Sequence, residues 1–341
     1  MTSPYSPVGE NAGDESLGEV GVSSLAAAAL SAEASGWLRR PVEPVLSRGT
    51  ADRGEDQRNP ERIEHEWPRA KVLIVDSNGR VAADTDGTSV HLRYSDALEM
   101  APTVPADAVL LGTVDGIDHW ALPGEVEATD RAFDDGWGRT GGGLRQWGGI
   151  LSDTESGLLT SATAVLTWHA MAQFCPRCGL PNRPSAAGWT RTCEQGHVEF
   201  PRTDPAVIML VHDGADHCVL ARQPSWPVDR YSILAGFTEA GESLEATVIR
   251  EVGEEVGVAV SEVNYLGSQP WPFPRSLMVG FAAKAQIGAE LTPRPGEIEK
   301  AQWVSRDRVR EALAAGGGVE GLILPSAVSI ARQLIDGWAT G

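Results

Sequence analysis

The sequence predicts an α/β protein whose strands form mixed sheets, and three kinds of pattern carry this prediction. Short apolar runs bounded by glycine, asparagine and aspartate recur along the chain, as expected for strands that end in turns. Two longer segments, 243–256 and 326–338, place apolar residues on one helical face. Residues 170–202 precede both of these helical segments and follow an earlier α/β region. They hold three cysteines at metal-ligand spacing, which indicates a small insert stabilised by a metal ion.

The first half of the chain predicts strands and one helix. Residues 71–75 form an apolar run followed by Asp-Ser-Asn-Gly, which is typical of a strand that ends in a turn. Two further runs, 108–112 and 119–122, flank the turn residues Asp115 and Gly116. Apolar spacing over 148–168 predicts a helical connector toward the insert.

The second half predicts a mixed sheet around a loop–helix–loop. The runs 206–211 and 218–221 read as strands paired across a turn, and the helix over 243–256 follows them. The remaining strands are expected at 263–267, 277–285 and 299–304. Together these patterns divide the chain into four parts: a disordered or partly helical extension (1–41), an N-terminal α/β domain with its connector (42–169), the insert (170–202) and a C-terminal domain (203–341).

Composition narrows the class of protein. The formal net charge is −19, with 47 acidic against 28 basic residues, which argues against a general binder of nucleic-acid backbones. A nucleic acid remains a possible substrate if only its end is recognised. No run of about 20 apolar residues is present, so we expect no membrane span. Few cysteines and no export signal favour a cytoplasmic location.

The most informative feature is a group of carboxylates on the helix over 243–256. Glu251, Glu254 and Glu255 stand at i, i+3 and i+4, so they share one helical face. Like charges at this spacing repel one another unless a cation binds between them. Carboxylate oxygens are the ligands preferred by Mg²⁺ and Mn²⁺, and Mg²⁺ is commonly shared with substrate phosphates. The pattern therefore predicts a divalent-metal site for phosphate chemistry.

The spacing around these carboxylates is that of a known motif. From Gly236 to Val258 the chain reads GFTEAGESLEATVIREVGEEVGV, and it resembles the Nudix box G-x5-E-x7-R-E-U-x-E-E-x-G-U at every specified position. The resemblance implies a Nudix fold for the C-terminal domain. Downstream, SQPWPFPRS (268–276) is similar to the motif of the NADH pyrophosphatase branch of Nudix hydrolases, which also carries a zinc ribbon ahead of the Nudix domain. The resemblance to this branch further implies a Nudix-like N-terminal domain and a homodimer.

The resemblance assigns roles residue by residue. It implies metal binding and catalysis by the three box glutamates and by Glu297, with Glu299 as a less favoured substitute. It implies substrate contacts from a second group, Phe200, Phe237, Trp271 and Ser276. Phe200 stands where the family usually has tyrosine and would reach the partner subunit's site. It keeps the stacking ring and lacks the hydroxyl.

The cysteine spacing of the insert predicts a structural zinc ion. Cys175 and Cys178 form a C-x2-C pair, and Cys193 with His197 forms a C-x3-H pair after a hairpin-sized gap. Four such ligands would hold one Zn²⁺ per chain with no open position for water. A disulfide or buried thiols are the alternative. We interpret Cys218, inside a strand pattern, as a core residue.

The predicted activity is metal-dependent hydrolysis of the diphosphate of NAD(H) to nicotinamide mononucleotide and AMP, extended by the resemblance to removal of NAD caps from RNA 5′ ends. Water would attack one phosphorus, and Glu255 or Glu297 would take its proton. Mg²⁺ and Mn²⁺ are both compatible with the motif. Hydrolysis of ADP-ribose or of dinucleoside polyphosphates uses the same box. A non-catalytic nucleotide-sensing Nudix protein and a zinc-ribbon nucleic-acid module are rivals from other classes.

Overall fold

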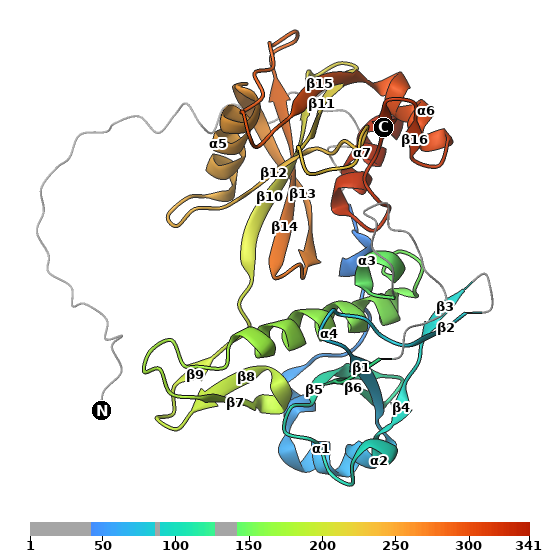
Figure 1. The fold of residues 1–341 in the computed structure, drawn as a ribbon, viewed down its shortest axis with the longest axis vertical. Helices are drawn as coiled ribbons and strands as arrows, with labels where there is room; N and C mark the ends of the chain where they lie inside the picture. The colour runs from blue at the N-terminus through green and yellow to red at the C-terminus, as the bar shows by residue number, and fades with distance from the viewer. Residues whose placement is uncertain (1–41, 86–88, 127–141) are drawn as a thin grey trace, which may run out of the picture. The chain divides into compact units, whose positions relative to one another are not determined.

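A computed structural model describes residues 42–85, 89–126 and 142–341 (Figure 1). The predicted extension over 1–41 lies outside these residues. Within the described ranges, no helix combines the length and the apolar character needed to cross a bilayer.

The N-terminal part is built on a four-stranded sheet in the order β4-β1-β6-β5. β1 and β6 run parallel, and β5 and β6 form an antiparallel hairpin whose turn residues Asp115 and Gly116 both have positive φ. The strands predicted at 71–75, 108–112 and 119–122 are therefore confirmed. The strand bounds are Lys71–Val75 (β1), Ser95–Asp96 (β4), Val109–Val114 (β5) and Ile117–Pro123 (β6), with a separate hairpin of Ala83–Thr85 (β2) and Val90–Leu92 (β3).

Helices cover this sheet on two sides. Trp67 and Trp120 meet edge to face in the cluster on one side, with centroids 5.6 Å apart. On the other side, Leu73 and Leu111 pack against Leu158 and Leu159 of helix α4. The helix bounds are Pro60–Glu66 (α1), Ala97–Met100 (α2), Leu144–Trp147 (α3) and Asp153–Met171 (α4), with 3-10 turns at Val45–Ser47, Glu55–Arg58 and Trp67–Arg69.

The helical connector begins later than its sequence pattern suggests. We expected a helix over 148–168, whereas α4 starts at Asp153, because the Ser152 side chain caps it by accepting a hydrogen bond from the Glu155 amide. The insert follows α4 as a three-stranded antiparallel sheet in the order β7-β8-β9. Its strands are Asn182–Ser185 (β7), Thr190–Cys193 (β8) and Val198–Glu199 (β9), with a 3-10 turn at Ala186–Gly188.

The C-terminal part contains the mixed sheet that the sequence predicts. Its order is β13-β14-β10-β11-β15, and β12 pairs with β10. The β10–β14 pair is parallel, and the other pairs are antiparallel. The strands are Asp204–His212 (β10), His217–Arg222 (β11), Leu234–Phe237 (β12), Val260–Trp271 (β13), Ser276–Ala285 (β14) and Lys300–Ser305 (β15), with a small hairpin of Gly318–Val319 (β16) and Leu322–Ile323 (β17).

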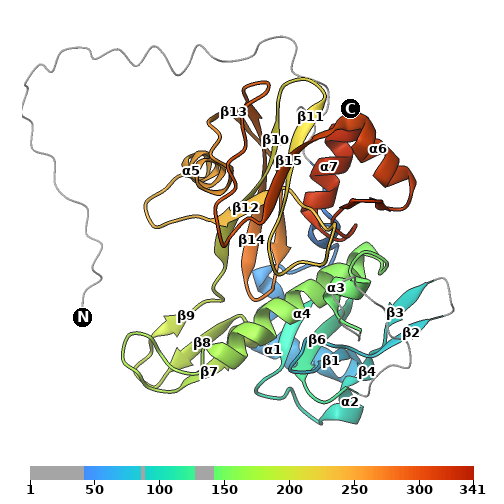
Figure 2. The ribbon, with the colours of Figure 1, turned by 45° about the horizontal axis from the view of Figure 1, so that its top comes forward.

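Helices lie on both faces of this sheet, with α5 on one side and α6 and α7 on the other in both views (Figures 1 and 2). The alternation along β10 explains the arrangement, because Val207 and Met209 join the cluster under α5 whereas Ile208 and Leu210 join the cluster under α7. The helix bounds are Leu244–Val256 (α5), Arg306–Ala314 (α6) and Ile330–Thr340 (α7). α7 starts after the predicted position because Ser329 caps it.

The proline-rich segment 268–276 lies at the edge of the sheet. β13 runs as far as Trp271 and includes Pro270, which pairs with Leu277 of β14. A proline removes a backbone donor, and the terminal position of β13 in the strand order makes this loss tolerable. Residues 272–275 then form the turn that leads to Ser276, the first residue of β14.

Candidate active site and metal centre

Helix α5 presents the predicted carboxylates because both of its ends are fixed locally. The Ser243 side chain accepts a hydrogen bond from the Ala246 amide at the N-terminus. Gly257 ends the helix in the left-handed conformation, with φ of 73°. Val248 and Val252 are fully buried against the sheet. This orientation carries Glu251 and Glu255 inward as well, to 8% and 3% exposure.

Gly236, the first residue of the box, has no room for a side chain. An added Cβ at this position would lie 1.9 Å from Cδ of Glu251. The Glu251 carboxylate therefore rests directly on the backbone of β12, in space that alanine would fill. The glycine at this position is needed for a close approach and not for an unusual backbone angle.

Arg250 joins the loop to the helix. Its Nε and Nη2 donate to the two carboxylate oxygens of Glu242 at 2.7 and 2.9 Å, and Nη2 also donates to the Phe237 carbonyl at 2.9 Å. This paired contact lowers the pKa of Glu242 to about 2. Nη1 lies 2.9 Å from Oε1 of Glu251. Arg250 and Glu242 therefore act as a clamp that orients Glu251.

Glu255 is the most unusual carboxylate of the site. Its Oε2 is buried and has no hydrogen-bond partner. Burial, followed by the charges of Glu251 and Glu297, raises the pKa of Glu255 to about 8. Burial also raises the pKa of Glu251, against the opposing effect of Arg250. Two buried carboxylates, one with an unsatisfied oxygen, form a donor set that suits a hard divalent cation.

Glu254 and Glu297 complete the group at its exposed side. Nη1 of Arg294 lies 3.5 Å from Oε2 of Glu254 and 3.4 Å from Oε2 of Glu297, so one guanidinium joins the two carboxylates. The Arg294 amide also donates to the Glu255 carbonyl at 2.9 Å. The charges of Glu251, Glu254 and Glu297 all act on the Glu255 carboxyl, so the four predicted glutamates are neighbours, although among the described residues only the Cys/His group of the insert has ligand atoms within 4.8 Å of one another. Glu299, the less favoured substitute, is instead paired with Arg222.

A cavity of about 420 Å³ opens beside Glu255. Its wall includes Ala235 of β12 and Trp271 of β13, and Arg145 of α3 contributes from the N-terminal part. The Arg145 guanidinium lies 3.8 Å from the Phe273 ring centroid and 5.1 Å from that of Trp271. A cavity of this size next to the buried Glu255 carboxyl has the character of a small-molecule site.

The other predicted substrate contacts are more dispersed. Phe237 and Phe200 are 58% and 69% exposed. Among the described residues that line the two cavities beside Trp271, neither ring appears. Ser276 is buried at the start of β14, opposite Trp271, and lines a second cavity. Within one chain, therefore, Trp271 borders the Glu255 cavity and the two phenylalanines do not. Their substrate roles stay predictions.

The buried Glu255 carboxyl leads to a prediction on pH and stability in buffer without Mg²⁺ or Mn²⁺. Its pKa is about 8 in the folded chain against an ordinary value of 4.5, so the folded state favours the protonated form. Its contribution to stability is complete below about pH 4.5 and declines as the pH rises toward 8, by at most about 1.4 kcal/mol per pH unit.

Glu255→Gln removes this titration. We expect the melting temperature of the wild type to fall relative to that of the variant between pH 5 and pH 8. Scanning calorimetry of both proteins across that range measures the difference. If the melting temperatures of the two proteins changed equally with pH, the Glu255 carboxyl would not be buried in an uncharged form.

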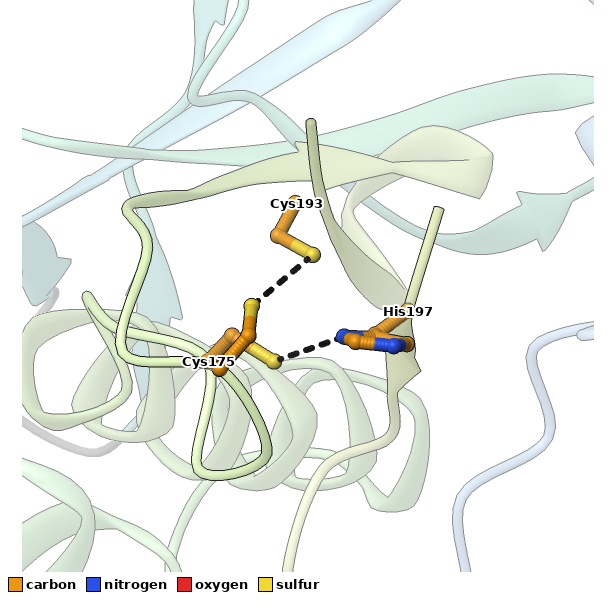
Figure 3. Close-up of side chains that lie close together, drawn as sticks. Cys175, Cys193 and His197 are labelled. Carbon is orange, nitrogen blue, oxygen red and sulfur yellow. Dashed lines mark hydrogen bonds between the residues drawn. The ribbon is translucent and has the colours of Figure 1, made fainter. Parts of the chain in front are cut away.

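Four side chains of the insert lie together as the spacing predicts, in a group that could hold a metal ion. One ligand atom from each of Cys175, Cys178, Cys193 and His197 lies within 4.8 Å of all the others. The Sγ atoms of Cys178 and Cys193 are 3.7 Å apart, and Sγ of Cys175 is 3.5 Å from Nδ1 of His197. Figure 3 shows the Cys175 and Cys193 side chains turned toward the space that His197 faces.

These separations fit a tetrahedral zinc site. Zinc–sulfur bonds of about 2.3 Å place two sulfur ligands about 3.8 Å apart in a tetrahedron. A disulfide bond of about 2.05 Å is much shorter, and the cysteines are free. Cys218 is fully buried in the cluster under α7 and takes no part in the group. The expectation that Cys218 is a core residue is confirmed.

Two residues that position the site, and the steric role of a third, were not found from the sequence. Arg294 follows a proline and precedes Glu297 by three positions, which is a weak local signal. Arg145 has no signal at all, since it lies far from the box in the chain. The steric role of Gly236 was also missed, because it depends on the position of the Glu251 carboxylate in the folded chain.

Comparisons with known proteins agree with the geometry. The family model of the NUDIX domain matches residues 202–320. An NAD-capped RNA hydrolase NudC from Mycobacterium bovis is 47% identical over 303 residues, which are 87% of this chain and 95% of that protein. The protein of the same name from Mycobacterium tuberculosis is 46% identical over the same coverage. NAD-capped RNA hydrolase NUDT12 from Homo sapiens is 38% identical over 198 residues, 55% of this chain and 42% of that protein.

Proposed function

The chain belongs to the Nudix family of NAD-capped RNA hydrolases, and on that premise we propose that it hydrolyses the diphosphate linkage of NAD(H) to nicotinamide mononucleotide and AMP and removes NAD caps from RNA 5′ ends. The observation that carries this proposal is the unsatisfied, buried Oε2 of Glu255 at the edge of a cavity and within a group of four glutamates. Such a group costs stability and is expected where it serves chemistry.

We propose that Mg²⁺ or Mn²⁺ binds to Glu251, Glu254, Glu255 and Glu297. The donor set is made of carboxylate oxygens alone, which suits hard cations and is poorly suited to softer ones. When bound, such ions offset the negative charge of the diphosphate and make a water molecule more acidic. The thiolate and imidazole ligands of the insert suit Zn²⁺, which would be structural because all four positions are filled by protein.

The proton of the attacking water is best accepted by Glu255. It lines the cavity, whereas Glu297 is half exposed and paired with Arg294. In the reaction the water oxygen forms a bond to one phosphorus, the P–O–P bond breaks on the other side, and the second phosphate leaves. Arg250 and Glu242 hold Glu251 still during this step.

The experiment that tests this function compares products from three substrates by mass spectrometry. With Mg²⁺ or Mn²⁺ present, NADH should yield reduced nicotinamide mononucleotide and AMP. NAD-capped RNA should yield nicotinamide mononucleotide and RNA with a 5′-monophosphate. A higher kcat/KM for ADP-ribose would favour the alternative Nudix activity. Nucleotide binding without turnover of any substrate would favour a non-catalytic sensor.

Three further proposals come from the family. The chain is divided at about residues 42, 170 and 203 into an N-terminal Nudix-like domain, a zinc ribbon and the catalytic domain. It acts as a homodimer, in which the exposed ring of Phe200 reaches the partner subunit's site beside Phe237. It works in the cytoplasm, where NAD(H) and RNA are both present. Size-exclusion chromatography with light scattering tests the dimer.

A further inference from the structure

A second cavity, of about 330 Å³, lies next to the first. Trp271 lines both, so the two share a wall. The floor of the second cavity comes from α4, where Gly157 packs closely on Gly49. A Cβ added to Gly157 would lie 2.5 Å from Cα of Gly49. The volume is within the range of small-ligand sites, although it is too small for a whole dinucleotide.

The charge of this cavity is opposite to that of the chain. Its lining includes Arg53, Arg202 and Arg275 and no aspartate or glutamate. The chain as a whole carries 47 acidic and 28 basic residues. Three arginines that converge on one cavity, without a carboxylate among the lining residues, form a local site for anions in an otherwise acidic protein.

Arg202 and Arg275 are fixed by ion pairs and, among the described residues, still have N–H donors that bind no other group. Nε of Arg202 and Nε of Arg275 donate to the two oxygens of Asp204, each at 2.7 Å. Arg275 and then Arg202 keep the pKa of Asp204 below its ordinary value, so the carboxylate stays charged. In the described part of the chain, the terminal nitrogens of these two arginines make no hydrogen bond. A guanidinium has five N–H donors, so both can still bind a phosphate.

Arg53 contributes from another segment. Its Nη1 lies 3.1 Å from Oγ of Ser161 on α4, a residue that is 8% exposed. Two indoles line the same space, Trp189 and Trp271. Trp189 is fixed by its Nε1, which donates to the Leu110 carbonyl at 2.6 Å. Cationic side chains interleaved with fixed aromatic rings are the usual means of binding single-stranded nucleic acid.

We propose that this cavity binds the nucleotides that follow the cap of an NAD-capped RNA, with phosphodiester groups on the arginines and a base against an indole. The inference rests on the proposed function, since it assumes that the cap occupies the Glu255 cavity. It explains how an acidic protein can hold RNA, because only the first phosphates of the strand need to be bound. The inference requires that a free dinucleotide leave most of this cavity empty, with contact only at its border with the first cavity, where Trp271 lies.

The test is the double variant Arg53→Gln/Arg202→Gln. Arg53 is exposed and the Arg202 side chain is 68% exposed, so both changes should leave the fold intact. The matched control is Arg69→Gln/Arg93→Gln, which removes two similarly exposed charges (65% and 59%) from the surface of the N-terminal part. Each protein is assayed on NADH and on an NAD-capped RNA of ten nucleotides, at several salt concentrations.

We expect kcat/KM of the double variant to fall by about tenfold or more on capped RNA and by less than about twofold on NADH. The slope of log(kcat/KM) for capped RNA against log(salt) should become less steep by about 1.4, or about 0.7 for each lost phosphate contact. The control variant should match the wild type on both substrates.

Two outcomes would overturn the inference. Equal losses on NADH and on capped RNA would mean that the cavity holds part of the dinucleotide itself. Unchanged activity on capped RNA would mean that the arginines do not contact the strand. Failure of the proposed function is seen separately, because the wild type would then hydrolyse neither substrate.

Discussion

Glu255→Gln is expected to lower kcat for NADH by about 10³-fold or more while changing the affinity for the dinucleotide by less than about threefold. Glutamine has nearly the same shape as glutamate but can neither accept a proton at this position nor offer a charged oxygen to a cation. The carboxyl is 3% exposed and its Oε2 has no partner in the protein, so no other group can replace it without rearrangement.

The matched control is Glu245→Gln, which makes the same chemical change on the exposed side of the same helix. Isothermal titration gives the affinity for NADH, and rapid-quench assays give kcat. The Mn²⁺-dependent rise in melting temperature should disappear in Glu255→Gln and persist in Glu245→Gln. Turnover by Glu255→Gln near the wild-type rate would remove the assignment of this site to catalysis.

Local patterns account for much of the site. Spacing at i, i+3 and i+4 predicts that Glu251, Glu254 and Glu255 gather on one side of a helix, and the ends of that helix follow from Ser243 and Gly257. The four zinc-type ligands are likewise close in sequence, in two short pairs. These features need only the geometry of one helix or one hairpin, which the sequence determines directly.

The remaining features depend on tertiary packing. Spacing does not distinguish Glu254, which is exposed, from Glu255, which is buried, because burial depends on how α5 lies on the sheet. The parallel pairing of β10 with β14 joins segments about 70 residues apart and has no local signal. The cavity with three arginines draws on positions 53, 202 and 275, so its positive charge is hidden in a sequence whose overall balance is negative.

Loss of the zinc site is expected to destabilise the insert more than any other single change in the chain. None of the hydrophobic clusters in the described residues is centred on the insert, and only Ala172, Ala187 and Trp189 pack against clusters of the N-terminal part. A segment this small cannot bury enough apolar surface to remain folded alone. Zinc coordination supplies the missing free energy, as in small domains that unfold without their metal.

Cys175→Ser should therefore abolish stoichiometric zinc and make the segment 174–199 sensitive to proteolysis and rapid in hydrogen exchange. Zinc is quantified by atomic absorption, and exchange is followed by mass spectrometry. Cys218→Ala is the matched control: Cys218 is also buried, but in the sheet cluster, so this variant should lose some stability and keep one zinc per chain.

The glutamate site and the zinc site should respond differently to Cys175→Ser. Because the box glutamates lie on α5 and are oriented by Arg250, kcat for NADH at low temperature should persist while the melting temperature falls. The loss of activity on heating would then follow the unfolding of the insert. A zinc-free Cys175→Ser protein with wild-type melting temperature and normal exchange in 174–199 would contradict a structural role for the metal.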